Sequence, residues 1–149
     1  MKLLVQRVKR ANCMVGSTIT GAIEEGLVTY VGFTAGDTTD DLSYLARKLV
    51  NLRIFDDENG VMNHSLLDKG YAVLSISQFT LYGDTTKGHR PSYAKALPPD
   101  LASPLYDAFN ALLQNTYNIT VETGRFGEHM VIEQINDGPV TIELRSKDK

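Results

Sequence analysis

Two polar motifs, each placed at the end of a β-prone run, contain the side chains that could do chemistry. The first is Ser-Gln-Phe-Thr at residues 77–80. Its Thr80 offers a hydroxyl, but no general base stands beside it in the sequence, and a threonine hydroxyl without a base is a weak nucleophile. A simpler interpretation makes Thr80 a β-branched strand residue and Ser77 a solvent-facing one. Both interpretations stay open on this evidence.

The second motif is Asn-Asp-Gly-Pro-Val-Thr at residues 136–141. Asp-Gly between two strands is a common hairpin signal, so Gly138 could be an ordinary turn glycine. Pro139 follows it directly, however, and a proline entering a strand removes a backbone donor and can adopt a cis bond. The segment therefore predicts the last turn of the chain, but not an ordinary two-residue hairpin.

Conventional catalytic and metal-binding patterns are missing from the sequence. It has no Gly-x-Ser-x-Gly elbow, which a serine hydrolase would need. Its three histidines are scattered and Cys13 stands alone, so neither a metal site nor a cofactor is expected. Residues 83–88 lack the residue order of a phosphate-binding loop. The acidic residues 56–60 favour a plain turn over a calcium loop, whose ligand spacing they lack.

Hydrophobic periodicity places the strands that would carry these motifs. Strands are predicted at residues 1–15, 26–34, 71–81, 119–122, 130–135 and 140–144. Alternation in the first strand slips once near Arg10 and Ala11. The second strand is apolar throughout and is expected to be central. A polar loop at residues 82–91 follows the third strand, and functional loops often lie in such places.

Two helices complete the predicted fold. One is capped by Thr38 or Thr39 and has an apolar stripe within residues 42–50. The other begins at Ser103-Pro104, with proline at the first helical position, and stops near residues 115–118. Because strands outnumber helices, we expect an α/β fold with a mixed sheet or barrel-like core covered by two main helices.

Composition limits the organisation and the partners of the chain. A length of 149 residues with 42% hydrophobic residues predicts one domain over residues 1–149. A net charge of −3 disfavours a protein that coats long phosphate backbones but allows contact with a nucleic-acid end. The single cysteine suits a reducing compartment, so a cytoplasmic location is expected. Neither a bilayer-spanning run nor a signal peptide is indicated, so no membrane partner is expected.

The longer motifs of the chain together resemble the D-aminoacyl-tRNA deacylases. They are SQFTLYGDTTKGHRPSY at residues 77–93, GRFGEHM at 124–130 and NDGPVT at 136–141, with QRV at 6–8, YLARKLVNLRIF at 44–55 and PPDLASPLYDAF at 98–109. This resemblance implies a hydrolase that cleaves the ester bond of D-aminoacyl-tRNA and spares L-aminoacyl-tRNA. It also implies a homodimer in which the Gly138-Pro139 turn, with a cis peptide, enters the partner's pocket.

The resemblance also implies roles for individual residues. The reaction pocket would be lined by Ser77, Gln78, Phe79 and Thr80, with Met130 close by. The family has been discussed with the residue equivalent to Thr80 as nucleophile. Because no base stands beside Thr80 in the sequence, we favour water assisted by the terminal ribose 2′-hydroxyl, with backbone N–H groups around Phe79 and Thr80 stabilising the oxyanion. Arg7 would brace the turn. Lys87, His89 and Arg90 would meet phosphates of the CCA end, although a solvated loop is an equal alternative for them.

In this resemblance the Gly138-Pro139 turn acts as a chiral filter, the part of the site that separates D- from L-amino acids. The glycine in it sets the expected range of substrates. Without a Cβ, Gly138 lets backbone carbonyls approach the substrate's α-carbon, where an L side chain would collide. Such a filter admits glycine, so glycyl-tRNA, including tRNA(Ala) mischarged with glycine, is an expected second substrate. Glu128 and His129 are more polar than the resemblance leads one to expect. A silent nucleic-acid-end binding module and a tRNA-independent esterase for D-amino acids remain rival hypotheses.

Overall fold

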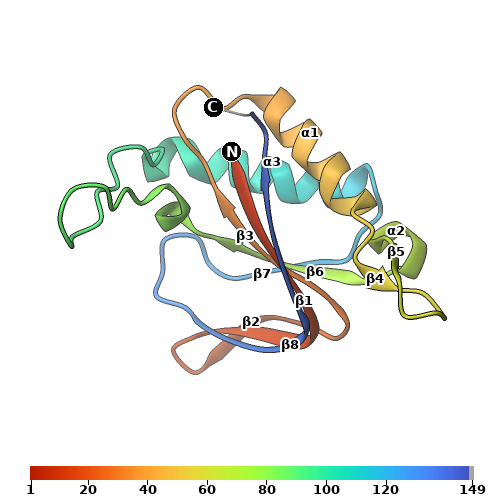
Figure 1. Ribbon diagram of the computed structural model, residues 1–149. Coiled ribbons are helices and arrows are strands. Elements are labelled where there is room, and N and C mark those ends of the chain that lie inside the picture. Colours follow the sequence, from red (N-terminus) through yellow and green to blue (C-terminus); the bar gives the residue numbers. More distant parts are fainter. Residues whose placement is uncertain (148–149) are drawn as a thin grey trace.

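A curved mixed sheet forms the centre of the computed structural model, which describes residues 1–147 (Figure 1). The sheet contains β1 (Lys2–Val15), β2 (Thr18–Ile23), β3 (Gly26–Gly32), β6 (Ala72–Ser77), β7 (Val121–Thr123) and β8 (Val131–Arg145). The strand order is β2-β1-β3-β6-β7, and β8 pairs with β1 off this path. The pairs β3–β6 and β6–β7 are parallel, whereas β1 is antiparallel to β2, β3 and β8. The predicted mixed sheet and the central position of β3 are confirmed.

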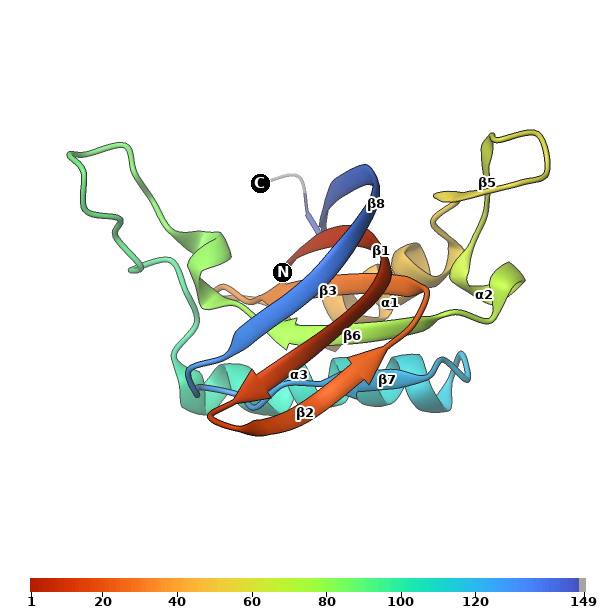
Figure 2. The ribbon, with the colours of Figure 1, turned by 90° about the horizontal axis from the view of Figure 1, so that it is seen from below.

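The sheet curls until β2 comes to lie against β7 (Figure 2). A Cβ atom placed on Gly21 would stand only 2.6 Å from the carbonyl oxygen of Thr123. Glycine at position 21 therefore permits the close approach of these two strands. The barrel-like core predicted from the sequence is confirmed by this near-closure.

Two long helices, α1 (Thr39–Asn51) and α3 (Pro99–Asn115), cover the sheet, as predicted. Both lie on the same side of it (Figure 1). Thr38 is the N-cap of α1, and its N–H donates to the Asp41 carboxylate at 2.7 Å. Burial opposes the charge on Asp41, but the Thr38 N–H and Lys147 outweigh it and lower the pKa of Asp41 to about 2. None of the helices found in residues 1–147 has the length and apolar character needed to cross a bilayer.

The predicted start of α3 at Ser103-Pro104 is wrong, because the helix begins at Pro99. Pro98 is the N-cap, Pro99 occupies the first helical position and Asp100 lies in the first turn, where its charge favours the positive helix end. Pro104 lies inside the helix and can donate no bond to the carbonyl of residue 100. The Pro-Pro-Asp sequence is thus the start signal.

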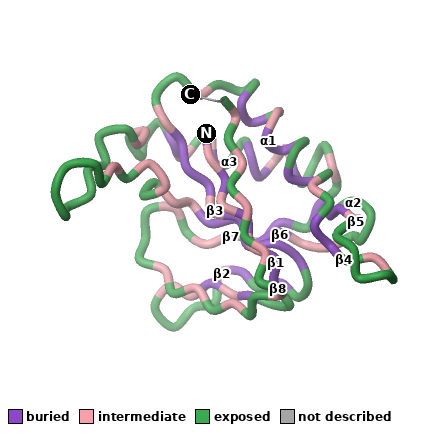
Figure 3. Tube along the Cα trace, viewed as in Figure 1, coloured by how far each residue is buried: buried purple, intermediate pink, exposed green. Residues whose placement is uncertain are grey.

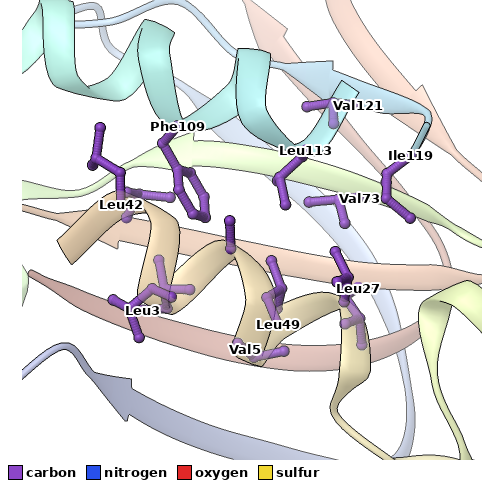
Figure 4. Packing of buried hydrophobic residues seen from close by; sticks show 14 of the residues in the cluster. Leu3, Val5, Leu27, Leu42, Leu49, Val73, Phe109, Leu113, Ile119 and Val121 are labelled. Carbon is purple, nitrogen blue, oxygen red and sulfur yellow. The ribbon is translucent and has the colours of Figure 1, made fainter. Parts of the chain in front are cut away.

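Two hydrophobic clusters occupy the two faces of the sheet. The larger one lies between the sheet and the long helices and contains Leu3, Val5, Leu42, Leu49 and Phe109 among others (Figure 4). The smaller one contains Val8, Ala11 and Cys13 of β1 with Ile76 of β6. Val8 and Ala11 are three residues apart and yet lie in the same cluster, so the alternation of β1 slips between them, as predicted. The buried residues lie on the inner strands and on the sides of the helices that face the sheet (Figure 3).

The third predicted strand and several short elements need correction. Strand β6 ends at Ser77, and residues Phe79–Tyr82 form a 3-10 turn, η1, instead of extending the strand to residue 81. Strand β7 begins two residues later than predicted. The acidic turn is confirmed: the Asp57 carboxylate accepts the N–H groups of Asn59 and Val61. It joins β4 (Phe55–Asp56) to β5 (Met62–His64), and these strands, β2 and the short helix α2 (Leu66–Lys69) were not predicted.

The last two predicted strands form one strand, β8, and the predicted turn between them is a bulge. In the β1–β8 ladder Asn136 pairs with Val8, and Thr141 pairs with Gln6. Residues 137–140 therefore stand opposite Arg7 alone. The strand continues past the bulge because β1 offers a pairing edge on both sides of it. The Gly138-Pro139 peptide in this bulge is cis.

Candidate active site

A pocket of about 390 Å³ opens where β3, β6, residues 126–130 and the start of α3 meet. Its volume suits a ligand of nucleoside size. Among the predicted site residues, Ser77, Gln78, Phe79 and Met130 line it. The pocket also has an apolar wall that the sequence analysis missed, made by Tyr30, Phe33, Leu97 and Ala102. Tyr30 and Phe33 belong to the segment that was predicted to be an apolar central strand, and Leu97 and Ala102 were given no role. Only the fold brings the four together at the pocket.

The Ser-Gln-Phe-Thr motif turns away from the sheet at the lip of this pocket. The Gln78 N–H donates to the carbonyl of Val31 at 2.8 Å, which is the last bond between the motif and β3. Turn η1 then begins at Phe79. The first N–H groups of a helical turn find no acceptor within that turn, so those of Phe79 and Thr80 are available to a ligand.

Thr80 is exposed and is not among the residues that line the pocket. Its hydroxyl oxygen accepts a hydrogen bond from the Gln78 side-chain amide. An amide N–H is a donor and cannot remove a proton from the hydroxyl. The contact orients Thr80 without activating it as a nucleophile.

Met130 reaches the pocket because Gly124 leaves space for it. A Cβ atom on Gly124 would lie 2.3 Å from the Met130 sulfur and 3.1 Å from the sulfur of Cys13. Cys13 is fully buried beneath this contact. Glu128 and His129, the unexpectedly polar pair, also line the pocket. They are its only carboxylate and imidazole among the described residues, so they add charge and polarity to a largely apolar cavity.

Arg7 and the bulge form a second group, separate from the pocket of the same chain. The Arg7 guanidinium is buried and donates to the carbonyl oxygens of Ile54 at 2.7 Å and Asp137 at 3.1 Å. It also forms an ion pair with Asp56 at 3.2 Å. Gly138 has a φ of +128°, which L side chains rarely adopt, and a Cβ there would lie 2.9 Å from the Val140 nitrogen. Arg7 therefore ties the bulge to the segment that follows α1.

The predicted tRNA-contacting residues Lys87, His89 and Arg90 lie together on an exposed loop that projects from the body of the molecule (Figure 2). None of the three lines the pocket. The base of the loop is closed by two backbone bonds of 2.8 Å between Asp84 and Ser92. The Thr86 N–H and hydroxyl, followed by Lys95, lower the pKa of Asp84 to about 2, so this carboxylate is ionised at neutral pH.

A family model described as D-Tyr-tRNA(Tyr) deacylase matches residues 4–145. The chain belongs to this family. The D-aminoacyl-tRNA deacylase of Bacillus pumilus is 57% identical to it, over 99% of this chain and 100% of the relative. The enzyme of the same name from Thermus aquaticus is 52% identical, over 100% of this chain and 97% of the relative. The resemblance seen in the motifs is thereby confirmed.

Two solved structures share the fold of this chain. The c-Myc DNA Unwinding Element Binding Protein has a TM-score of 0.93 and 41% sequence identity, and 99% of each chain is covered. A probable eukaryotic D-amino acid tRNA deacylase has a TM-score of 0.84, with coverage of 96% of this chain and 97% of that one. Its 17% identity supports the fold alone.

Proposed function

We propose that the chain hydrolyses the ester bond of D-aminoacyl-tRNA, releasing the free D-amino acid and the tRNA. The observation that carries this proposal is the family match over nearly the whole chain, together with an intact Ser-Gln-Phe-Thr turn at the lip of a nucleoside-sized pocket. An aminoacyl ester is more reactive than an amide. Positioning and charge stabilisation are therefore the main tasks left to the protein.

The chemical step relies on backbone donors. The N–H groups of Phe79 and Thr80 stabilise the oxyanion that forms when water attacks the ester carbonyl. Water is the nucleophile, and the terminal ribose 2′-hydroxyl assists it. The Thr80 hydroxyl is occupied as the acceptor of the Gln78 amide, which supports a positioning role for this residue.

Chiral selection comes from a second copy of the chain. The Gly138-Pro139 bulge lies outside the pocket of its own chain, and Pro139 is exposed, so the bulge is free to enter the pocket of a partner in a homodimer. There the backbone of Gly138 stands next to the substrate's α-carbon. A D-amino acid directs hydrogen at this backbone, whereas an L-amino acid directs its side chain at it.

The acceptor end of tRNA is the proposed partner, and the cytoplasm is the proposed compartment. Lys87, His89 and Arg90 lie on the projecting loop, where they can meet phosphates of the CCA end. Contact limited to the tRNA tip is consistent with a net charge of −3. The one cysteine, Cys13, is buried and free, as suits a reducing compartment.

Parallel assays of D-tyrosyl-tRNA, L-tyrosyl-tRNA and D-tyrosine ethyl ester test the function. We expect rapid loss of the D-charged tRNA alone. Tight binding of tRNA without turnover would favour the silent binding module, a rival that stays in the test because a relative of 41% identity is named as a DNA-binding protein. Preferential cleavage of the ethyl ester would favour the tRNA-independent esterase.

Removing the Thr80 hydroxyl is expected to leave much of the activity. Because water is the nucleophile, Thr80→Val and Thr80→Ala should retain kcat within about tenfold of the wild-type value, a loss well below that of removing an essential nucleophile. Single-turnover hydrolysis of D-tyrosyl-tRNA measures the chemical step. A fall of both variants to the uncatalysed rate, with the fold intact by circular dichroism, would assign the attack to Thr80.

Glycyl-tRNA is an expected second substrate. Glycine presents hydrogen toward the filter in either orientation, so the steric exclusion that rejects L-amino acids does not act on it. Glycyl-tRNA, including tRNA(Ala) mischarged with glycine, should be consumed at enzyme concentrations that consume D-tyrosyl-tRNA. L-alanyl-tRNA(Ala) is the matched control, since it adds only a methyl group. Survival of glycyl-tRNA under these conditions would refute the filter.

A further inference from the structure

Phe79 and Tyr93 are the two aromatic side chains in residues 1–147 that are exposed to solvent; every other phenylalanine and tyrosine is buried or partly buried. Their exposed fractions are 56% and 42%. The two rings pack edge to face, with centroids 5.1 Å apart and an interplanar angle of 74°. Two adjacent rings exposed in this way offer faces on which a base can stack.

Backbone contacts on both sides position the pair. Gly83 lies under the Tyr93 ring, because a Cβ on Gly83 would stand 3.2 Å from Tyr93 Cε1. The Gly83 N–H in turn donates to the Thr80 carbonyl at 2.9 Å, which links the ring to turn η1. On its other side Tyr93 follows directly after Ser92, which pairs with Asp84. The ring therefore has a fixed place beside the turn that carries Phe79.

The pair lies at the lip of the pocket, since Phe79 is also one of its lining residues. In the proposed function the pocket receives the terminal aminoacylated nucleoside, so an aromatic pair at its lip is placed next to the nucleotide that precedes it. The loop that carries Tyr93 also carries Lys87 and Arg90, which are exposed, and Lys95, which forms an ion pair with Asp84 at 3.2 Å. Aromatic faces flanked by cations are how proteins bind single-stranded nucleic acid.

We infer that Phe79 and Tyr93 form a stacking platform for the unpaired base that precedes the terminal nucleotide of the tRNA. This inference rests on the proposed function and adds a binding site outside the reaction pocket. The platform would hold the CCA end in line with the pocket while the flanking cations contact its phosphates. Stacking accepts any base, so the platform adds affinity for a single-stranded end and no preference among tRNAs.

The chain contains no tryptophan, so Tyr93→Trp would introduce the only indole and a direct fluorescent reporter. We expect deacylated tRNA with an intact CCA end to quench this indole. The same tRNA without its last two nucleotides should not quench it. Tyr117→Trp, just beyond the end of α3, is the matched control and should respond to neither tRNA. Unchanged emission of the Tyr93→Trp protein at tRNA concentrations that give full binding in a gel-shift assay would overturn the inference.

Kinetics give an independent test. Tyr93→Leu should raise KM for D-tyrosyl-tRNA about tenfold with kcat within twofold, as expected for one lost stacking contact. Tyr93→Phe keeps the ring and should restore the wild-type KM. If Tyr93→Leu lowers kcat instead, or if Tyr93→Phe is as defective as Tyr93→Leu, the platform is refuted. Failure of the wild-type chain to hydrolyse D-tyrosyl-tRNA at all would refute the proposed function, whereas the fluorescence of the Tyr93→Trp protein reports on the platform without turnover.

Discussion

Replacing Arg7 with alanine lowers the free energy of unfolding by about 3 kcal/mol, the expected cost of losing a buried charged donor with several partners. The substitution removes the donor that lies 2.7 Å from the Ile54 carbonyl oxygen. It also removes the hydrogen bond from Arg7 to the Asp137 carbonyl in the bulge. Asp56 and Asp137 are partly exposed, so water can replace Arg7 at their carboxylates and limits the loss. Urea unfolding measures the effect.

The same substitution also reduces deacylation, because the bulge loses its link to the body of the molecule. A shift of the turn by about 1 Å is enough to lower kcat/KM on the order of a hundredfold. Assays are made well below the melting temperature, so that the folded fraction does not limit the rate. Arg7→Lys keeps the positive charge but lacks the several N–H donors of the guanidinium group. It should therefore recover only part of the activity.

Arg10→Ala is the matched control, since Arg10 lies on the same strand and is exposed. It removes the same charge without removing a buried contact, so its stability should stay within about 0.5 kcal/mol of the wild-type value. An Arg7→Ala protein as stable and as active as Arg10→Ala would show that the bulge holds its shape without Arg7.

Replacing Gly138 with alanine should abolish most of the activity while leaving the fold intact. At a φ of +128° the new Cβ would lie 2.9 Å from the Val140 nitrogen and 3.3 Å from Arg7 Nη2. Backbone strain of this kind costs about 2 kcal/mol, and the bulge can relieve it only by moving. In the proposed dimer the methyl group would also occupy the space that the α-hydrogen of a D-amino acid needs. We expect kcat/KM for D-tyrosyl-tRNA to fall on the order of a hundredfold.

Gly16→Ala is the control variant. It tests the effect of placing alanine at a positive φ away from the bulge. Gly16 also has a positive φ, +58°, but nothing lies within 4 Å of the position of its Cβ. It should therefore cost about 1 kcal/mol of stability and leave deacylation unchanged. Equal activity of Gly138→Ala and the wild-type chain on D-tyrosyl-tRNA would remove Gly138 from the filter.

The elements that could be predicted are those whose signals are local. Helix α1 has its cap at Thr38, its acidic first turn and its apolar stripe within one short segment. Strand β2 was missed because it is short, contains Gly21 and is only partly apolar; its pairing with β1 and its contact with β7 make it a strand. The bulge in β8 was mistaken for a turn for the same reason, since the partner edge of β1 decides that the strand continues.

In the site, too, the residues that local motifs mark could be named from the sequence, whereas contacts between distant segments could not. Ser77, Gln78, Phe79 and Met130 come from separate motifs and line one pocket. Their part in the reaction stays a prediction. The Phe79–Tyr93 pair was not foreseen because it depends on the Asp84–Ser92 bridge, which folds the loop back on itself. Separation of the bulge from the pocket of its own chain could not be derived from spacing along the sequence.

Pairing between β1 and β8 has a consequence for the order of events during synthesis. Strand β1 leaves the ribosome before the other strands of the sheet, yet one of its edges stays unpaired until the residues of β8 have followed. Arg7 reaches its acceptor on Asp137 only at that late stage. A nascent chain interrupted before β8 would expose a long open strand edge, which is a template for aggregation. Completion of the sheet and formation of the Arg7 contact with the bulge are thus a single late step.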